Sequence, residues 1–326
     1  MSVKPRIFLT RELPPLSMET LRRESELTMN QEDRCLEKSE ILDGIREVDG
    51  LLCLLTDTID DEILAAGKHL KVVANFAVGF NNIDVASATA RRIPVTNTPG
   101  VLTDTTADMT WALLMDAARR VSESDRYVRT RAWQGWGPLQ FLGADVTGAT
   151  LGIIGMGRIG RSVVRRAKGF DMRVVYWNRT RLSVEQEREL GIEYLEFEGL
   201  LETSDFVSLH VALNEQTRHL ISGDQLALMK PTAVIINTTR GPVIDEKALC
   251  LALRDGTIAS AGLDVYEREP LLEEPLYGLE NVVLAPHLGS ATIGTRTKMG
   301  NMAVENCLAG CRGDRPTHVV NPEIYE

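Results

Sequence analysis

A glycine motif between an expected strand and an expected helix most constrains what this chain can fold into. Gly155, Gly157 and Gly160 follow an apolar run over residues 150–154 and open a stretch with helical spacing. The first glycine permits a tight turn, the second lets the backbone approach a phosphate, and the third lets helix and strand pack closely. Free amides at the helix start favour an anion. With another strand expected over 173–177, the segment predicts a dinucleotide-binding βαβ unit; the alternative is an ordinary glycine-rich turn.

Composition narrows the class of protein. A chain of 326 residues exceeds the usual size of one hydrophobic core, and its 44% apolar content is ample for burial, so we expect two domains. The net charge of -10, without a long Lys or Arg run, indicates that neither nucleic acid nor an anionic membrane is a partner. No apolar signal core or membrane span is evident, so we expect a cytoplasmic protein. Five cysteines without zinc-site spacing are expected to be reduced thiols, with no metal bound.

Short apolar runs alternate with helical stretches along most of the chain, which predicts an α/β fold with parallel sheets. The first series of expected strands covers residues 6–9, 50–55, 71–74 and 95–97. The second series covers residues 150–154, 173–177, 206–210, 233–237, 261–265 and 282–284. One long helix is expected from residue 106 to about residue 131, and a closing helix over 291–310.

The closing helix follows the second series, so it is free to pack on the first domain. We therefore expect two doubly wound parallel-sheet domains, with a Rossmann dinucleotide-binding domain (102–289) inserted into a discontinuous flavodoxin-like substrate domain (1–101 and 290–326). In that arrangement a substrate is expected in the cleft between domains.

Candidate catalytic residues follow expected strands of the second series. Arg240 comes soon after the strand that ends at residue 237, where open parallel sheets bind ligands. Its planar fork suits a carboxylate with a neighbouring carbonyl. His287 follows another strand between Pro and Gly residues and is a candidate acid or base. A carboxylate beside it would stabilise the imidazolium form; we favour Glu269 over Glu267, which spacing alone does not decide. Each of these residues could instead be a surface or structural side chain.

The expected ribose-binding position lacks the Asp or Glu that is common in NAD sites. It holds Asn178, Arg179, Thr180 and Arg181, and no carboxylate is present to repel a 2′-phosphate. Arg179, with the Thr180 hydroxyl and Arg181 as a second cation, would bind that phosphate. The segment therefore favours NADP(H), with NAD(H) and two solvated arginines as the alternative.

Taken together in this order, the motifs resemble those of the D-2-hydroxyacid dehydrogenases over nearly the whole chain. Segments 74–84, 98–103 and 136–139 resemble the glyoxylate/hydroxypyruvate reductase branch. The resemblance implies that Arg240 binds the substrate's carboxylate and carbonyl, that His287 donates a proton, and that Glu269 tunes it. It also implies a homodimer formed through the long helical region.

The resemblance implies further contacts. Substrate-binding positions, in addition to Arg240, are Leu54, Val78, Gly79 and Trp136, of which Trp136 would enter the partner subunit's site. The expected cofactor contacts are Thr106, Gly155, Gly157, Arg158, Ile159, Gly160, Asn178, Arg179, Thr180, His210, Val211, Thr217, Thr238, Thr239, Asp264, His287 and Gly289. Two positions depart from the family pattern: Ala212 stands where Pro is usual, and Asn81 stands where Asp is common.

The sequence therefore predicts an oxidoreductase that reduces a small 2-keto acid, glyoxylate or hydroxypyruvate, with NADPH and without a metal. A 2-ketogluconate reductase, or another D-2-hydroxyacid dehydrogenase, is the related alternative. A cofactor-sensing corepressor is the alternative from a different class, because such family members keep the Arg, Glu and His residues. Turnover of keto acids would separate the two classes.

Overall fold

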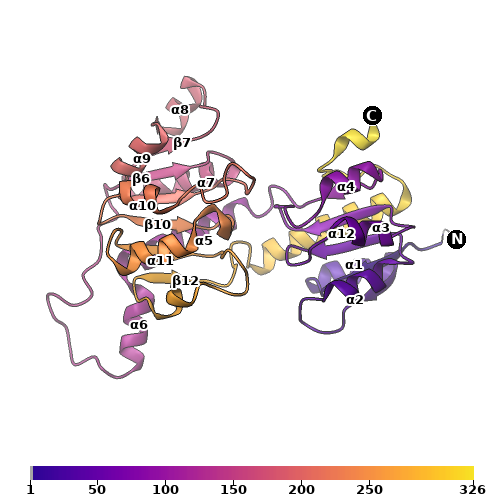
Figure 1. Cartoon of the computed structure of the whole chain (residues 1–326), viewed down its shortest axis with the longest axis horizontal. Helices are drawn as coiled ribbons and strands as arrows, with labels where there is room; N and C mark the ends of the chain where they lie inside the picture. Colours follow the sequence, from indigo (N-terminus) through magenta and orange to yellow (C-terminus); the bar gives the residue numbers. More distant parts are fainter. Residues whose placement is uncertain (1–2) are drawn as a thin grey trace. The chain divides into compact units, whose positions relative to one another are not determined.

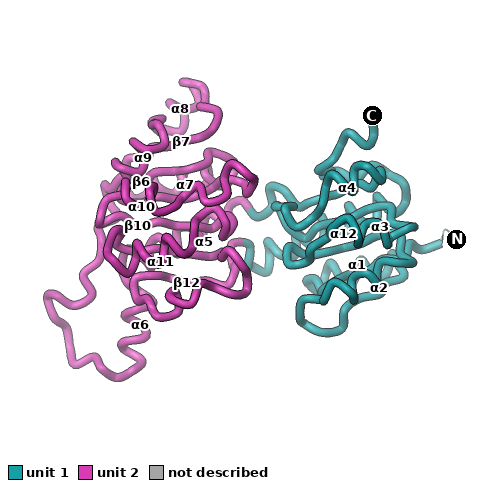
Figure 2. The backbone as a smooth tube through the Cα atoms, in the orientation of Figure 1, with its two compact units in different colours: residues 1–102, 290–326 teal, residues 103–289 magenta. Residues whose placement is uncertain are grey.

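The computed structural model describes residues 3–326, and the chain divides into two compact units (Figure 2). Unit 1 contains the residues up to Leu102 together with Ser290–Glu326, and unit 2 contains Thr103–Gly289. The chain thus crosses between the units twice, and the first crossing lies one residue later than the boundary drawn from the sequence. Within residues 3–326, no helix combines the length and apolar character that a membrane span requires.

Unit 1 is built on a five-stranded parallel sheet in the order β2-β1-β3-β4-β5. Its strands are β1 (Arg6–Leu9), β2 (Glu26–Met29), β3 (Gly50–Leu54), β4 (Val72–Phe76) and β5 (Val95–Thr96). Its helices are α1 (Pro15–Glu24), α2 (Lys38–Ile45), α3 (Asp61–Ala66), α4 (Val85–Ala90) and α12 (Ile293–Arg312), followed by the short 3-10 helix η4 (Pro322–Tyr325).

Helices cover both faces of this sheet because successive strand residues point to opposite sides. In β1, Ile7 and Leu9 are buried in a core with residues of α1 and α12. Phe8, between them, is buried in a second core with residues of α2 and α3. The apolar strand thus buries both faces, as doubly wound parallel sheets require.

Unit 2 has a seven-stranded parallel sheet in the order β12-β11-β10-β9-β6-β7-β8 (Figure 1). Its strands are β6 (Thr150–Ile154), β7 (Arg173–Trp177), β8 (Glu193–Tyr194), β9 (Phe206–Leu209), β10 (Val234–Asn237), β11 (Ser260–Leu263) and β12 (Val282–Leu284). Its α-helices are α5 (Thr103–Arg119), α6 (Val121–Arg129), α7 (Arg158–Ala167), α8 (Val184–Leu190), α9 (Phe197–Thr203), α10 (Gly223–Leu228) and α11 (Glu246–Arg254). Its 3-10 helices are η1 (Lys168–Phe170), η2 (Gly241–Val243) and η3 (Glu274–Gly278).

Two cores also flank the sheet of unit 2. Ile153 is buried with apolar residues of α5 and α7, whereas Ile154 is buried with residues of α9, α10 and α11. The predicted α/β class with two parallel sheets is therefore confirmed. The short edge strands β2 and β8 were not predicted, because their partly exposed, polar residues lack the apolar run that marked the central strands.

The single helix expected from residue 106 to about 131 is wrong, because the chain breaks at Arg120. Arg120 has a left-handed conformation with φ of 55°, which ends α5 and starts α6. The Asp116 carboxylate accepts a hydrogen bond from the Ser122 amide at 2.7 Å, and Arg120 pairs with Glu123 at 2.7 Å. These contacts fix the break, which helical spacing alone does not reveal.

Residues 121–142, called the apolar arm below, begin with α6 and extend away from the sheet of unit 2 (Figure 1). Every residue of α6 is at least partly exposed. The large apolar side chains exposed along the arm are Val121, Val128, Trp133, Trp136, Leu139 and Leu142. A run of apolar side chains without a covering element marks an interaction surface.

Candidate active site

Three loops of unit 2 carry the predicted catalytic residues at one edge of the sheet. Strands β10, β11 and β12 are neighbours, and their last residues, Asn237, Leu263 and Leu284, are in register. Arg240, Glu269 and His287 lie in the loops that follow these strands. Because all three strands are parallel, their carboxyl ends open onto the same edge, where this class of sheet binds ligands.

His287 and Glu269 form the hydrogen-bonded pair that the sequence only suggested. Nδ1 of His287 lies 2.8 Å from Oε2 of Glu269, whose other oxygen accepts a hydrogen bond from the Tyr266 amide at 3.1 Å. Burial raises the pKa of Glu269, but the hydrogen bond and charge of His287, the Tyr266 amide and Arg240 outweigh burial, so the pKa is lowered. An ionised Glu269 accepts the Nδ1 proton, so Nε2 is the His287 nitrogen that this hydrogen bond does not use.

Arg240 is held in a loop that Asn237 organises. The Asn237 side chain accepts a hydrogen bond from the Thr239 amide at 3.0 Å and donates one to the Arg240 carbonyl at 3.0 Å. The next residue, Gly241, leaves no room for a side chain, because a Cβ there would lie 1.8 Å from the Tyr266 carbonyl carbon. Burial lowers the pKa of Arg240 and Glu269 opposes that shift. The Arg240 loop is thus pressed directly against the loop that carries Glu269.

Asp264 fixes the loop that carries His287, a role that the sequence did not reveal. Its buried carboxylate accepts hydrogen bonds from the amides of Leu288 at 2.6 Å and Gly289 at 2.7 Å. Burial raises the pKa of Asp264, while these two amides and His287 oppose the shift. Since His287 has an uncommon positive φ of 58°, this grip stabilises a backbone conformation that few side chains adopt. Thr106 lines the same place, since a Cβ on Gly289 would lie 3.4 Å from it.

The glycine motif has the geometry of a phosphate-binding turn. Gly155 has φ of 100°, and a Cβ there would lie 2.6 Å from the His210 carbonyl carbon. A Cβ on Gly160 would lie 2.3 Å from the Gly155 oxygen, so helix α7 and the turn are in close contact. At Gly157, the N-cap of α7, a Cβ would meet no atom of residues 3–326 within 4 Å. The backbone beside the first-turn amides of Arg158 and Ile159 is therefore uncovered at Gly157, and amides at the start of a helix favour an anion.

Two groups after strand β9 also suit a dinucleotide. Burial lowers the pKa of His210 to about 3, so its ring is neutral at physiological pH. Nε2 of His210 lies 2.8 Å from the Ser208 hydroxyl, while its buried Nδ1 has no hydrogen-bond partner among residues 3–326. Val211 follows it, and the Thr217 hydroxyl donates to the Ala212 carbonyl at 2.7 Å and closes the next turn. An unpaired buried polar atom is uncommon in folded proteins.

The expected ribose-binding segment follows β7. Asn178 accepts a hydrogen bond from the Met156 amide at 3.2 Å and donates one to the Thr180 carbonyl at 2.8 Å, which joins this segment to the glycine turn. The exposed Arg179 reaches Gln216 at 3.4 Å. Arg181, expected as a second phosphate-binding cation, instead makes two hydrogen bonds to Glu187, at 2.8 and 2.9 Å. The role of Arg181 as a second phosphate-binding cation stays a prediction, and in this structure its guanidinium is paired with Glu187.

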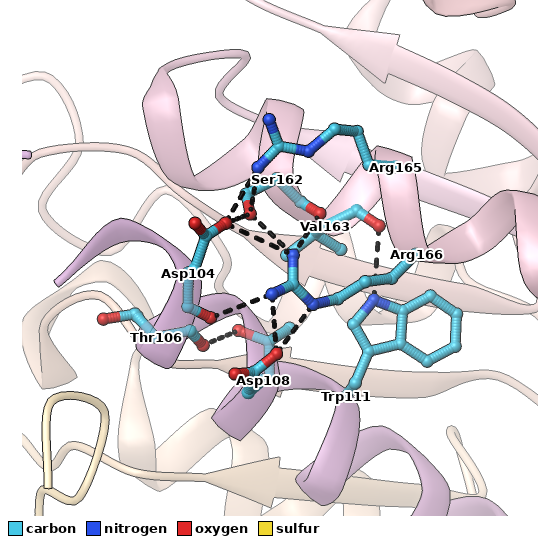
Figure 3. Close-up of polar contacts among 9 residues, drawn as sticks. Asp104, Thr106, Asp108, Trp111, Ser162, Val163, Arg165 and Arg166 are labelled. Carbon is cyan, nitrogen blue, oxygen red and sulfur yellow. Dashed lines mark hydrogen bonds and ion pairs between the residues drawn. The ribbon is translucent and has the colours of Figure 1, made fainter. Parts of the chain in front are cut away.

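A polar network joins the first turns of α5 to α7, the helix that begins at the glycine turn (Figure 3). The buried Ser162 hydroxyl donates to Asp104 at 2.6 Å and accepts from Arg166 at 2.6 Å. Arg166 also pairs with Asp108 at 2.6 Å. Farther along α5, the hydroxyl groups of Thr110 and Thr238 form a hydrogen bond of 2.9 Å. The network therefore joins the start of α5, the helix that carries Thr106, to α7, and it was not foreseen.

The substrate-binding positions predicted in unit 1 lie at the carboxyl ends of β3 and β4. Three asparagine side chains donate hydrogen bonds to backbone carbonyls there. Asn82 donates to Leu54 at 3.1 Å, Asn97 to Val78 at 2.8 Å and Asn75 to Gly79 at 2.9 Å. The carbonyls of the 78–79 loop are therefore held by asparagine side chains of unit 1. These asparagines were missed, because an asparagine in a loop has no spacing that reveals its partner.

Trp136, the remaining predicted substrate contact, lies in the apolar arm and is 85% exposed. The arm borders a cavity of about 650 Å³ at the amino-terminal edge of the unit 2 sheet. Its lining includes Phe206, Val234 and Val282, which are the first residues of β9, β10 and β12. The cavity thus lies at the sheet edge opposite Arg240, Glu269 and His287, and the candidate active site is not there.

Known proteins resemble this chain in sequence and in structure. Residues 111–289 match the family model of the D-isomer specific 2-hydroxyacid dehydrogenase NAD binding domain. The glyoxylate reductase of Korarchaeum cryptofilum is 52% identical over 326 residues, covering 99% of this chain and 98% of that protein.

Two solved structures are also similar along nearly their whole length. The TT0316 protein of Thermus thermophilus has a TM-score of 0.90 at 43% identity, over 97% of this chain and 99% of its own. The NADPH-dependent glyoxylate/hydroxypyruvate reductase of Sinorhizobium meliloti, solved with NADP and malonate, has a TM-score of 0.85 at 34% identity, over 97% of each chain. These coverages include both units.

Proposed function

This chain belongs to the D-isomer specific 2-hydroxyacid dehydrogenase family and is an oxidoreductase acting on CH–OH groups, and we propose that it reduces glyoxylate and hydroxypyruvate with NADPH. The observation that carries the proposal is the 2.8 Å contact between His287 and Glu269 in loops beside that of Arg240. This set supplies an anion-binding fork and a proton donor, which are the two things that a 2-keto acid needs from the protein.

In the proposed reaction, each residue acts at a stated atom. Arg240 binds the substrate's carboxylate and carbonyl oxygen and polarises the carbonyl. His287, protonated on both nitrogens, donates the Nε2 proton to that oxygen, while Glu269 keeps hold of Nδ1 and stabilises the cation. A reduced nicotinamide bound at the glycine turn would supply the hydride for the carbonyl carbon. The product is a 2-hydroxy acid, and His287 is reprotonated from solvent.

We propose that the cofactor is NADP(H) in preference to NAD(H). The pyrophosphate of the cofactor would bind at the glycine turn (Gly155, Gly157 and Gly160) and the start of α7. His210 would contact the cofactor with a neutral ring, because burial lowers the pKa of that side chain. At the ribose end, Arg179 and Thr180 are left to bind a 2′-phosphate, because Arg181 is paired with Glu187. The NADPH dependence named for the Sinorhizobium meliloti relative supports this preference.

We further propose that Leu54 and the amides of Val78 and Gly79 bind the substrate, and that the protein is a homodimer joined through the apolar arm. The asparagine contacts that hold the carbonyls of these unit 1 residues support the first proposal. The exposed large apolar side chains on the arm support the second. Trp136 would then complete the substrate site of the other subunit.

The test is the loss of reduced-cofactor absorbance with glyoxylate, hydroxypyruvate, pyruvate and 2-ketogluconate, each with NADPH and with NADH. Fast turnover of glyoxylate and hydroxypyruvate with NADPH is the expected result. Turnover with NADH alone would support the proposed enzymatic activity and contradict the proposed 2′-phosphate site. Preference for 2-ketogluconate would change the substrate, and tight NADPH binding without turnover of any acid would favour a cofactor sensor.

A further inference from the structure

Glu246, the first residue of α11, carries a buried carboxylate that the proposed reaction does not use. Its side chain is enclosed, with only 5% of the residue exposed. Oε2 accepts a hydrogen bond from the Glu267 amide at 2.8 Å, and Oε1 accepts one from the Glu273 amide at 2.6 Å. These two amides stand on either side of Glu269 in the chain. One carboxylate therefore accepts hydrogen bonds from both ends of the loop that carries Glu269.

The grip is reciprocal. The Glu267 carboxylate accepts a hydrogen bond from the Glu246 amide at 3.1 Å, and the same oxygen lies 2.7 Å from Nε2 of His219. Each of the two glutamates thus binds the other's backbone amide. A buried carboxylate needs such donors, because an ion left without hydrogen bonds in the interior costs several kcal/mol. The contacts are therefore part of a fixed arrangement of backbone and not a solvated acidic surface.

The same cluster reaches the loop of Arg240. The His219 amide donates a hydrogen bond to the Pro242 carbonyl at 2.8 Å, and Pro242 lies two residues beyond Arg240. Gly241 packs on the backbone of Tyr266, in the loop of Glu269. His219, Glu246 and Glu267, called the loop clamp below, therefore join the loops of Arg240 and Glu269 into one unit.

We infer that Glu246 is a positioning residue, which sets Glu269 against His287 through the backbone of residues 267–273. The inference rests on the proposed function, since it assigns Glu246 an effect on turnover through the Glu269–His287 pair. Hydrogen-bond alignment in such a pair tolerates little displacement, and a shift of about 1 Å can cost on the order of 100-fold in rate. Glu246 touches neither substrate nor cofactor in this assignment.

The substitution Glu246→Gln tests the inference, because a glutamine of the same shape keeps one acceptor oxygen and loses the other. We expect kcat for glyoxylate with NADPH to fall about 10- to 100-fold, while the Kd for NADPH changes far less. Glu274→Gln is the matched control, because Glu274 is exposed on the same stretch of chain and lies outside the clamp. That control should keep the wild-type kcat.

A double substitution separates positioning from a general loss of structure. Glu269→Gln alone should lower kcat, and adding Glu246→Gln to it should lower kcat by less than about threefold more, because residues that act through one another are not additive. The inference would be overturned if Glu246→Gln lowered kcat as much in the Glu269→Gln variant as in the wild type. A wild-type kcat for Glu246→Gln alone would also overturn it. If Glu269→Gln itself keeps the wild-type kcat, the proposed role of Glu269 fails, and the inference fails with it.

Glu267→Gln provides a second route if Glu246→Gln does not fold. It weakens the contacts to His219 and to the Glu246 amide while leaving the buried Glu246 carboxylate in place. The expected pattern is the same: a lower kcat alone, and little further loss with Glu269→Gln. Additive losses would again overturn the inference.

Discussion

At the scale of single residues, His287 is the group whose removal best tests the proposed chemistry. Its Nδ1 is held by Glu269 at 2.8 Å, so its other nitrogen is the proposed proton donor. We expect His287→Ala to lower kcat by about 10²- to 10⁴-fold, the usual contribution of a general acid, and to change the Kd for NADPH far less. Steady-state kinetics and cofactor fluorescence titration measure the two quantities.

The control for that substitution is His69→Ala. His69 lies in unit 1 with an exposed side chain and only a distant acidic neighbour, Glu47, at 4.0 Å. It should keep the wild-type kcat. A near-normal kcat in His287→Ala would remove this residue from the reaction, and equal losses of kcat and of NADPH affinity would assign it to cofactor binding instead.

His210 predicts a dependence of stability on pH. Its pKa is lowered by burial to about 3 in the folded protein, against about 6.5 when unfolded. Between these values the unfolded chain binds a proton that the folded chain does not, so the stability contributed by the neutral ring is present above about pH 6.5 and is lost as pH falls. The loss should approach, but not exceed, about 1.4 kcal/mol per pH unit.

Urea unfolding of the wild type and of His210→Asn, from about pH 7 to about pH 5, measures this effect. The free energy of unfolding should fall more steeply for the wild type than for the variant below about pH 6.5, and the two curves should run parallel above it. Parallel curves over the whole range would mean that folding does not lower the pKa of His210.

The residue types of the candidate site could be read from the sequence, but their supports could not. Arg240 and His287 follow strand ends between Pro, Gly and Thr residues, which is a pattern that one-dimensional spacing displays. Asp264 and Glu246, by contrast, act on amides up to 25 and 27 residues away in the chain. Such pairings depend on which loops the sheet order brings together, so the sequence does not contain a local signal for them.

At the scale of elements, the polar network between α5 and α7 predicts a stability effect. Ser162 is 1% exposed and links Asp104 of α5 to Arg166 of its own helix. Ser162→Ala removes these two hydrogen bonds and a longer one from Arg165 at 3.1 Å, and it leaves the Arg166 group less well satisfied. We therefore expect the free energy of unfolding to fall by about 1–2 kcal/mol. Urea denaturation followed by the fluorescence of unit 2 tryptophans measures the change.

Arg165→Ala is the matched substitution within the same network. Arg165 also reaches Asp104, at 2.8 Å, but its side chain is 63% exposed. An exposed ion pair contributes little, so the loss should stay below about 1 kcal/mol. If Arg165→Ala costs as much as Ser162→Ala, buried hydrogen bonding is not what joins the two helices.

Helices and strands could be predicted where a buried segment appears in the sequence as a continuous run of apolar residues. The central strands of both sheets were expected close to where they lie, because parallel strands are apolar on both faces. The end of α5 was not predicted, because residues 103–131 keep a helical spacing of apolar side chains through the break. What ends α5 is the left-handed conformation of Arg120, fixed by side-chain contacts such as that of Asp116 with Ser122.

At the scale of the whole molecule, the crossing of the chain between two units follows from where the last α-helix lies. α12 packs on α1 and on strands β3 and β4, although all of unit 2 stands between it and them in the sequence. The sequence order of the strands allowed this arrangement to be predicted, since the second sheet was complete before α12 began. The apolar arm is different, because its side chains are left uncovered by either core of its own unit.

An uncovered apolar arm predicts association of two copies of the chain. Leu139 and Leu142 are 82% and 62% exposed, and burying such side chains contributes about 1.5–3 kcal/mol each. We expect light scattering to give the mass of a dimer for the wild type, and the double substitution Leu139→Asp and Leu142→Asp to give a monomer. A monomeric wild type, or a variant that stays dimeric, would contradict the proposed role of the arm.

Trp136 allows the proposed role across the dimer to be tested separately from folding. Because this side chain is 85% exposed within its own chain, Trp136→Ala should leave the thermal stability of the isolated monomer variant unchanged. In the dimer, the same substitution should raise KM for glyoxylate, since it removes an apolar wall from the other subunit's site. A raised KM in the dimer, together with an unchanged KM when the substitution is made in the monomeric variant, is expected only if Trp136 acts on the partner. An equal rise in both would assign the tryptophan to the site of its own chain.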